Sequence, residues 1–113
     1  MRLTSVMWLG VFMRLETARN AYVTVLKKGA QQAGALFVVR IRSDQLLDLY
    51  GPAPQSFFDD EEPDRLFECL FEGISQAEAD QYLEKQQKFD PDLWIIETEA
   101  GSGEISLEIR HSD

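Results

Sequence analysis

Three short apolar runs between residues 22 and 50 constrain the fold of this chain more than any other feature of its sequence. Each run is rich in the β-branched, aromatic and aliphatic residues that are typical of strands. Two segments of turn-forming residues separate the runs: Gly29 to Gly34, with a glycine at each end, and the polar Ser43 to Gln45. The pattern predicts an antiparallel meander with strands at Tyr22 to Lys27, Ala35 to Arg42 and Leu46 to Tyr50.

The register of this meander follows if both turns close as simple hairpins. Val25 then lies opposite Val38, and Val38 lies opposite Tyr50, although a single bulge would shift this pairing. One face of the sheet carries the side chains that we expect in the core: Tyr22, Thr24, Leu26, Phe37, Val39, Ile41, Leu47 and Leu49.

The opposite face of the predicted sheet is mixed in character. It places Arg40 across from Asp48 and has an apolar centre made of Val25, Val38 and Tyr50. Three interpretations stay open for this centre: another element covers it, a partner binds it, or it is ordinary surface.

Length and composition indicate one domain, residues 1–113, with enough apolar surface for a core, since 44% of its 113 residues are hydrophobic. The single cysteine excludes an intramolecular disulfide and indicates a reducing compartment, so we expect a cytoplasmic protein. The 11 basic and 20 acidic side chains give a net charge of −9, which disfavours nucleic acids and anionic membranes as partners. The apolar run from Val6 to Met13 is too short to span a bilayer.

The segment before the meander is predicted to be a helix from Ser5 to Arg19. Its apolar residues follow helical spacing, Thr4 or Ser5 can cap its start, and Asn20 suits a left-handed stop. Its β-branched and aromatic content also permits a strand from Met7 to Glu16.

The second half of the sequence predicts two more helices and two more strands. Apolar spacing indicates a helix from Asp64 to Glu72, and the capping box Ser75 to Glu78 begins another helix, from Gln76 to about Lys88. Leu93 to Thr98 is apolar on both faces, as in a central or doubly covered strand, and Glu104 to Arg110 alternates as in an edge strand or a fraying tail. We therefore expect an α+β fold with an antiparallel sheet of four to five strands. The chain order would be α-β-β-β-α-α-β-β, with the helices packed mainly on one face.

No group of side chains matches a catalytic or cofactor-binding motif, so we predict no catalytic residue, cofactor or metal site. Four carboxylates, Asp59 to Glu62, allow a metal-site interpretation, but they precede Pro63 as a solvated helix cap does and lack calcium-loop spacing. Cys69 has acidic neighbours, which disfavours a reactive thiolate. The single histidine, His111, lies in a predicted tail, where neither a triad nor a histidine-rich metal site can form.

Four sequence motifs, taken together, resemble one known family. They are Met1-Arg-Leu-Thr-Ser5 with Trp8, Lys28-Gly29 with Ala33-Gly34-Ala35, Leu49-Tyr-Gly-Pro-Ala-Pro-Gln-Ser56, and Lys88-Phe-Asp-Pro-Asp-Leu-Trp94. In order and spacing they are similar to the motifs of the bacterial family called domain of unknown function 1491, which is found largely in alphaproteobacteria. The resemblance covers nearly the whole chain and implies no activity, substrate or catalytic residue.

Two functions remain as hypotheses. The first is a non-enzymatic protein-interaction module that binds a partner protein, or a second copy of itself, through the mixed sheet face with Val25, Val38 and Tyr50, or through the final edge strand. The second is a small-molecule-binding protein or an enzyme, with a pocket between the Tyr50 to Gln55 arm and the Asp90 to Trp94 loop. The residues expected to line this pocket are Tyr50, Gln55, Asp90, Asp92 and Trp94.

Overall fold

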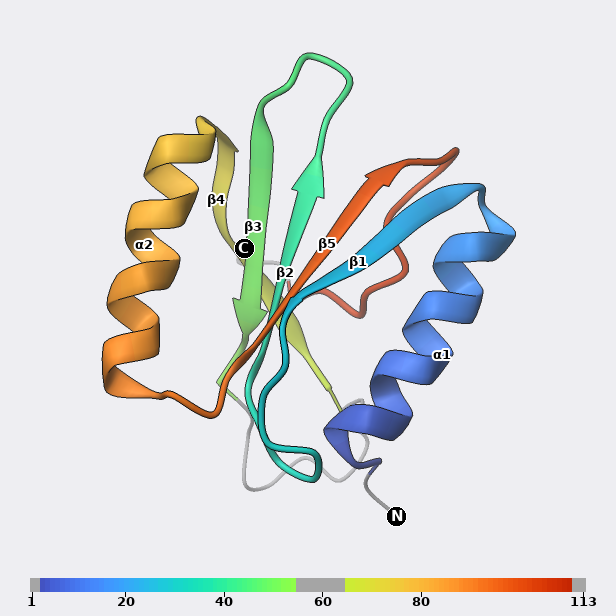
Figure 1. Ribbon diagram of the computed structural model, residues 1–113. Coiled ribbons are helices and arrows are strands. Elements are labelled where there is room, and N and C mark those ends of the chain that lie inside the picture. Colours follow the sequence, from blue (N-terminus) through green and yellow to red (C-terminus); the bar gives the residue numbers. More distant parts are fainter. Residues whose placement is uncertain (1–2, 55–64, 111–113) are drawn as a thin grey trace.

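Two helices and five strands form an α+β fold in the computed structural model, which describes residues 3–54 and 65–110 (Figure 1). The predicted fold class is confirmed. Gln55, the acidic run from Asp59 to Glu62 and His111 lie outside the described residues. In chain order the elements are α1 (Ser5–Ala18), β1 (Ala21–Lys27), β2 (Leu36–Ile41), β3 (Leu47–Pro52), β4 (Phe67–Ile74), α2 (Gln76–Phe89) and β5 (Trp94–Ala100).

Local capping signals fix both helix starts, as the sequence predicts. The Thr4 hydroxyl accepts a hydrogen bond from the Met7 backbone N–H (3.1 Å), and the Ser75 hydroxyl accepts one from the Glu78 N–H (3.2 Å). Each bond satisfies an amide that has no partner within the first helical turn. The alternative of an N-terminal strand is therefore wrong.

The sheet is mixed, with the strand order β1-β5-β2-β3-β4. Three of its four strand pairs are antiparallel, and β2 pairs with β5 in parallel. The predicted β2–β3 register is confirmed, since Val38 pairs with Tyr50 and Arg40 with Asp48. The predicted hairpin of β1 with β2 is wrong: β5 lies between them, and Val25 pairs with Ile96. The physical reason is the apolar character of β5 on both faces, which favours a central position.

Residues 67–74 form strand β4, so the predicted helix from Asp64 to Glu72 is wrong. The register shifts between the pairs Leu49 with Phe71 and Tyr50 with Cys69, which leaves Leu70 as an extra residue. This bulge turns Leu70 and Phe71 toward the same side of the sheet, the side on which α2 lies. There Leu70 packs against the apolar cluster that includes Leu83, and the Phe71 and Tyr82 ring centroids are 5.0 Å apart. Two successive apolar side chains on one face imitate helical spacing, and this explains the incorrect prediction.

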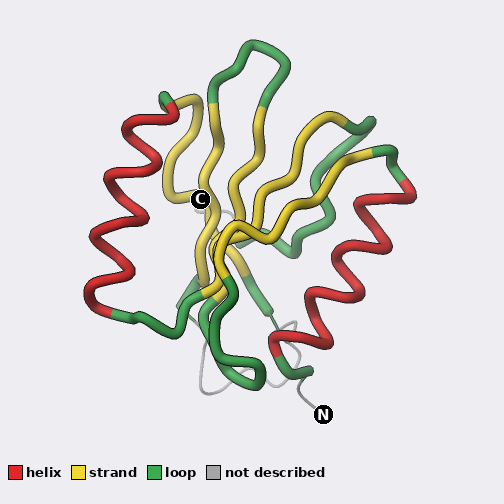
Figure 2. Tube along the Cα trace, viewed as in Figure 1, coloured by secondary structure: helices red, strands yellow, loops and turns green. Residues whose placement is uncertain are grey.

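The two helices lie on opposite faces of the sheet, which corrects the expectation that helices pack mainly on one face (Figures 1 and 2). We call the face under α1 the inner face and the face under α2 the outer face. On the inner face, Leu9 and Phe12 of α1 pack with the β-strand residues Val38 and Ile96. On the outer face, Ala79 and Leu83 of α2 pack with Phe37, Val39, Leu47, Leu49 and Ile95.

The predicted core face is only partly correct. Its β2 and β3 members are covered by α2, but Tyr22 (73% exposed) and Leu26 (52% exposed) on β1 are not. The reason is that β1 lies at the sheet edge, one strand further from β2 than the hairpin prediction placed it.

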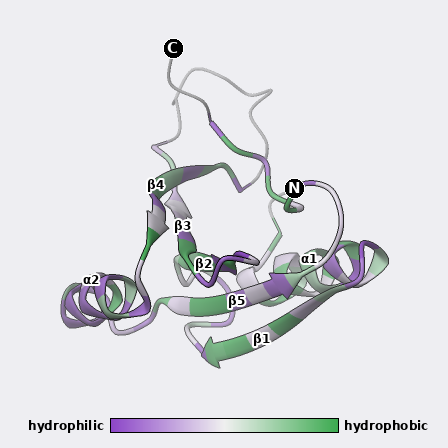
Figure 3. Ribbon diagram, turned by 90° about the horizontal axis from the view of Figure 1, so that it is seen from above, coloured by the Kyte–Doolittle hydropathy of each residue, from purple (hydrophilic) through white to green (hydrophobic). Residues whose placement is uncertain are grey.

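Residues 104–110, which we call the C-terminal strap, are neither a regular edge strand nor a frayed tail. The strap crosses the inner side of the curved sheet (Figure 3) and makes one parallel bridge, between Ile109 and Phe67 of β4. Ile105 is buried, and Leu107 and Ile109 pack against the inner core. Within the described residues, no helix is long and apolar enough to cross a membrane.

Candidate functional site

The apolar centre of the mixed sheet face, Val25, Val38 and Tyr50, is covered by other elements. Val38 is fully buried, Tyr50 is 7% exposed, and Val25 is half-buried against the same cluster. The cover comes from α1 and from Ile105 of the C-terminal strap. The expectation that this face is open for a partner is therefore corrected: only the first of its three interpretations applies in this structure.

A polar groove opens beside this covered centre, where β2, β3 and β4 run next to one another. Its volume is about 560 Å³. A second depression of about 680 Å³ shares three of its lining residues, Arg40, Asp48 and Glu72. The other residues that line the first groove are Tyr50, Glu68, Cys69, Ile109 and Arg110.

Asp48 and Tyr50 form the buried floor of the groove. The Asp48 carboxylate accepts a hydrogen bond from the Gly73 N–H (2.9 Å) and lies 3.6 Å from the Arg42 guanidinium. Burial raises the pKa of the Tyr50 phenol, and Asp48 and Cys69 raise it further, while the charge of Arg40 and its hydrogen bond to the phenol oppose the rise. Tyr50 is therefore a neutral hydrogen-bonding group at physiological pH.

Cys69 reaches the groove from β4, but its surroundings do not activate it. Burial raises the pKa of the Cys69 thiol, and Asp48 and Glu72 raise it further. The thiol donates a hydrogen bond to the Phe71 carbonyl oxygen at 3.3 Å. A protonated thiol among carboxylates is a poor nucleophile.

The Asp90 to Trp94 loop does not join Tyr50 in this groove; its polar atoms hold another turn in place. Asp90 accepts a hydrogen bond from the Asp92 N–H (3.1 Å), and the Asp92 carbonyl oxygen accepts one from the Ala30 N–H (2.9 Å). The Trp94 indole N–H donates to the Ala30 carbonyl oxygen at 2.8 Å, and Trp94 is 2% exposed. The loop thus docks the turn that links β1 to β2.

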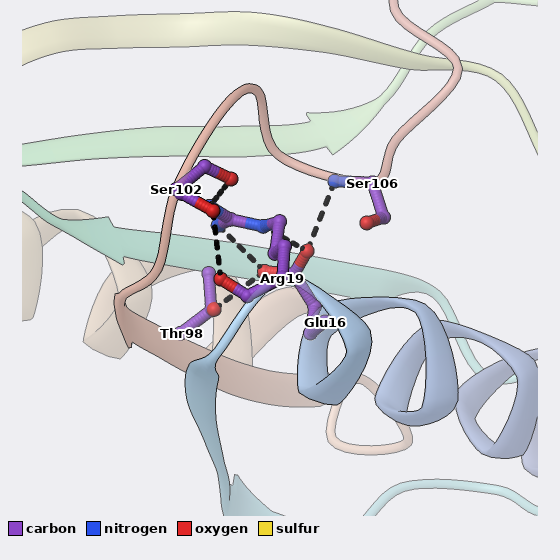
Figure 4. Close-up of polar contacts among 5 residues, drawn as sticks. All are labelled: Glu16, Arg19, Thr98, Ser102 and Ser106. Carbon is purple, nitrogen blue, oxygen red and sulfur yellow. Dashed lines mark hydrogen bonds and ion pairs between the residues drawn. The ribbon is translucent and has the colours of Figure 1, made fainter.

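Glu16 is a polar centre that sequence reasoning missed (Figure 4). It is fully buried and accepts hydrogen bonds from the Arg19 Nε (2.6 Å), the Thr98 hydroxyl (2.6 Å) and the Ser106 backbone N–H (3.1 Å). Burial alone would raise the pKa of Glu16, but these hydrogen bonds outweigh it and lower the pKa to about 2. The sequence does contain a signal for the burial of Glu16: it lies one helical turn beyond Phe12, on the side of α1 that faces the core.

A second missed feature is a concentration of exposed apolar side chains on α1, which covers the inner face, and on the edge strand β1, where Tyr22 and Leu26 point to the outer face. Of the ten large apolar side chains that are exposed in the described part of the chain, seven lie on these two elements, and we call them the α1–β1 flank. They are Val6, Met7, Val11, Met13, Leu15, Tyr22 and Leu26. The signal in the sequence was the apolar character of the first helix on all sides.

Comparisons with known proteins place the chain in a structural context. The sequence profile of a family described as "Protein of unknown function (DUF1491)" matches residues 3–108. The solution structure of a protein from A. tumefaciens is 39% identical over 100% of this chain and 98% of that chain, with a TM-score of 0.86. A crystal structure of a DUF1491 family protein from Caulobacter crescentus is 24% identical over 98% of this chain and 100% of that chain, with a TM-score of 0.77. No curated protein matches the chain.

Proposed function

Because this chain belongs to the DUF1491 family of unknown function, we propose a function from its own surface: it is a protein-interaction module that associates with a second copy through the α1–β1 flank. The observation that carries the proposal is the concentration of exposed apolar side chains on that flank. Met7 (53% exposed), Val11 (43%) and Leu15 (51%) lie at successive four-residue intervals, so they form one stripe along α1. Exposed apolar patches of this kind mark association sites.

The distribution of charge favours a second copy as the occupant. The chain carries 20 carboxylate side chains and a net charge of −9, so most approaches between two copies are repulsive. Residues 3–28 contain a single carboxylate, that of Glu16, and it is buried. A two-fold contact through this flank therefore avoids the carboxylate–carboxylate repulsion that most other approaches between two copies would meet, and it requires Arg14, Lys27 and Lys28 to lie apart from their copies.

The open edge of β1 supplies the backbone part of the proposed interface. β1 is the outermost strand on its side of the sheet, and a register shift between Val25 and Lys27 limits its regular pairing to Ala21–Val25. Antiparallel pairing of this segment with its copy, centred on Val23, would join two sheets across a two-fold axis. The bulge keeps the pairing short, so we expect a weak dimer in the micromolar range.

Light scattering coupled to size exclusion tests the self-association. We expect the dimer fraction of the wild-type chain to rise between micromolar and millimolar concentration. Leu15→Glu or Tyr22→Glu should weaken the dimer by about tenfold or more, because each places a charge in an apolar contact. Both side chains are exposed, so both variants should keep the fold.

Phe89→Glu is the matched control, because Phe89 is 78% exposed but lies at the end of α2 and is not one of the seven flank residues. It should leave the dimer fraction unchanged. A wild-type chain that stays monomeric at millimolar concentration would contradict the proposal, as would equal loss of the dimer in the Phe89 variant.

A second candidate function is the binding of a small zwitterion in the Tyr50 groove. The half-buried Arg40 guanidinium lies among the groove's carboxylates, and this arrangement offers both charges to one ligand. Glycylglycine is a suitable probe. We expect it to shift the NMR signals of the Arg40 and Tyr50 amides, and Arg40→Met should abolish the shifts; shifts that persist in the variant would exclude this site.

A further inference from the structure

We infer that the cleft now occupied by the C-terminal strap is a binding site for an extended peptide of a partner protein, which displaces the strap. The peptide would carry apolar side chains at three alternate positions and a basic residue directly after the third, as in the strap sequence Ile105-Ser-Leu-Glu-Ile-Arg110. This inference is independent of the α1–β1 flank, because it rests on the buried side of α1 and on the strap, and not on the exposed side chains of the flank.

The backbone contacts of the strap are ones that any peptide following the same backbone path can make. The Phe67 N–H donates to the Glu108 carbonyl oxygen (2.8 Å), and the Arg110 N–H donates to the Phe67 carbonyl oxygen (2.7 Å). The Ser106 N–H donates to the buried Glu16 carboxylate at 3.1 Å. All three bonds use main-chain groups of the strap, so they recognise its backbone path and not a particular sequence; this path bends at Ser106, where the Leu107 N–H donates to the Ile105 carbonyl oxygen at 2.9 Å.

The side chains of the strap define the chemistry that the cleft selects. Ile105 is 7% exposed and belongs to the inner apolar cluster with Leu9, Phe12 and Ile96. Leu107 and Ile109 are half-buried against the same cluster, and the Arg110 guanidinium donates to the Pro54 carbonyl oxygen at 2.6 Å. A competing peptide must therefore present one fully buried apolar residue, two partly buried ones and a cation.

The strap is paired with the sheet less extensively than the strands are paired with one another. It follows a turn in which Ala100, Gly101 and Gly103 have positive φ values of 67°, 89° and 74°. The strap is joined to the sheet by one bridge, in contrast to the continuous ladders between the strands. It can leave without breaking a strand pair of the sheet, and its departure uncovers the apolar inner face that Val38 and Tyr50 share.

A labelled peptide with the sequence EISLEIR tests the inference on the full-length chain. In the wild type, the tethered strap competes at an effective concentration near millimolar, so binding should be weak. Ile105→Ser in the chain removes the buried anchor of the strap and raises the open fraction. Fluorescence anisotropy should then show binding that is about tenfold tighter or more.

Three controls keep the outcome unambiguous. The peptide EDSLEIR, with aspartate at the buried position, should not bind, and Phe89→Ser should leave binding unchanged. Circular dichroism verifies the fold, and Leu107→Ser at a half-buried position is the milder variant if Ile105→Ser does not fold. A folded variant that binds EISLEIR no better than the wild type would overturn the inference, and so would a dimer formed by exchange of straps between two copies.

Hydrogen exchange provides an independent measurement on the wild type. We expect the Phe67 and Arg110 amides to exchange together, and faster than the amides of β5, because one local opening frees both. If both amides exchange only at the rate of global unfolding, the strap is a fixed part of the core and the inference is wrong.

Discussion

Replacement of Gly29 by alanine is expected to lower the stability of this fold by about 3 kcal/mol or more, and its Tm by roughly 10 °C or more. A Cβ atom at this position would lie 2.2 Å from the Asp92 carbonyl oxygen and 2.7 Å from the Leu93 carbonyl carbon. Both atoms are backbone, so neither can rotate away. The alanine would push the β1–β2 turn off the Asp90 to Trp94 loop, and the Trp94 indole would lose its bond to Ala30.

Gly10→Ala is the matched control for this prediction. Gly10 lies within α1, and a methyl group at this position would meet no other part of the fold within 4 Å. Alanine there should therefore stabilise the helix by roughly 0.5–1 kcal/mol. Thermal unfolding followed by circular dichroism compares the two variants. Equal Tm values for the wild type and Gly29→Ala would show that the close approach of turn and loop is not required.

Replacement of Glu16 by glutamine should cost about 3 kcal/mol of unfolding free energy at pH 7 and change the acid stability of the protein. The pKa of Glu16 is lowered in the folded state from 4.5 to about 2. A lowered pKa means that the ionised carboxylate stabilises the fold above pH 4.5, and that this stabilisation is lost as the pH falls from 4.5 toward 2. The difference in unfolding free energy between wild type and Glu16→Gln should therefore decrease as the pH falls from 4.5 toward 2.

Urea unfolding at a series of pH values measures this difference. Glu84→Gln is the control, because Glu84 is exposed on α2 and should leave the pH profile unchanged. If the difference in unfolding free energy between wild type and Glu16→Gln stayed constant from pH 7 to pH 2, the carboxylate charge would contribute nothing to stability, and only the shape of the side chain would matter.

The parts of the fold that the sequence predicts correctly are those decided by neighbours along the chain. The caps at Thr4 and Ser75 and the β2–β3 hairpin each depend on residues a few positions apart. The partner of β1 depends on β5, which is distant in sequence and equally apolar on both faces, so no local pattern could select it. The bulge at Leu70 likewise arises from pairing with β3 and leaves only a misleading helical spacing in the sequence.

The candidate site follows the same rule. Arg40, Asp48 and Tyr50 come together because they belong to one hairpin, and the sequence predicts this arrangement. To predict that Val38 and Tyr50 are buried, one must know where α1 and the C-terminal strap lie. The positions of these two elements depend on contacts between residues far apart in the sequence. Glu16 shows the difficulty most clearly, since its partners Thr98 and Ser106 come from the opposite end of the sequence.

The position of β5 between β1 and β2 has a consequence for biosynthesis. Every strand pair that joins β1 to the rest of the sheet passes through β5, which is the last strand to be made. At roughly 5–20 residues per second, several seconds separate the synthesis of β1 from that of β5, its neighbour in the sheet of the described residues. During this interval the nascent α1–β1 unit has no sheet to pack on, so we expect it to be the segment that molecular chaperones protect at the ribosome.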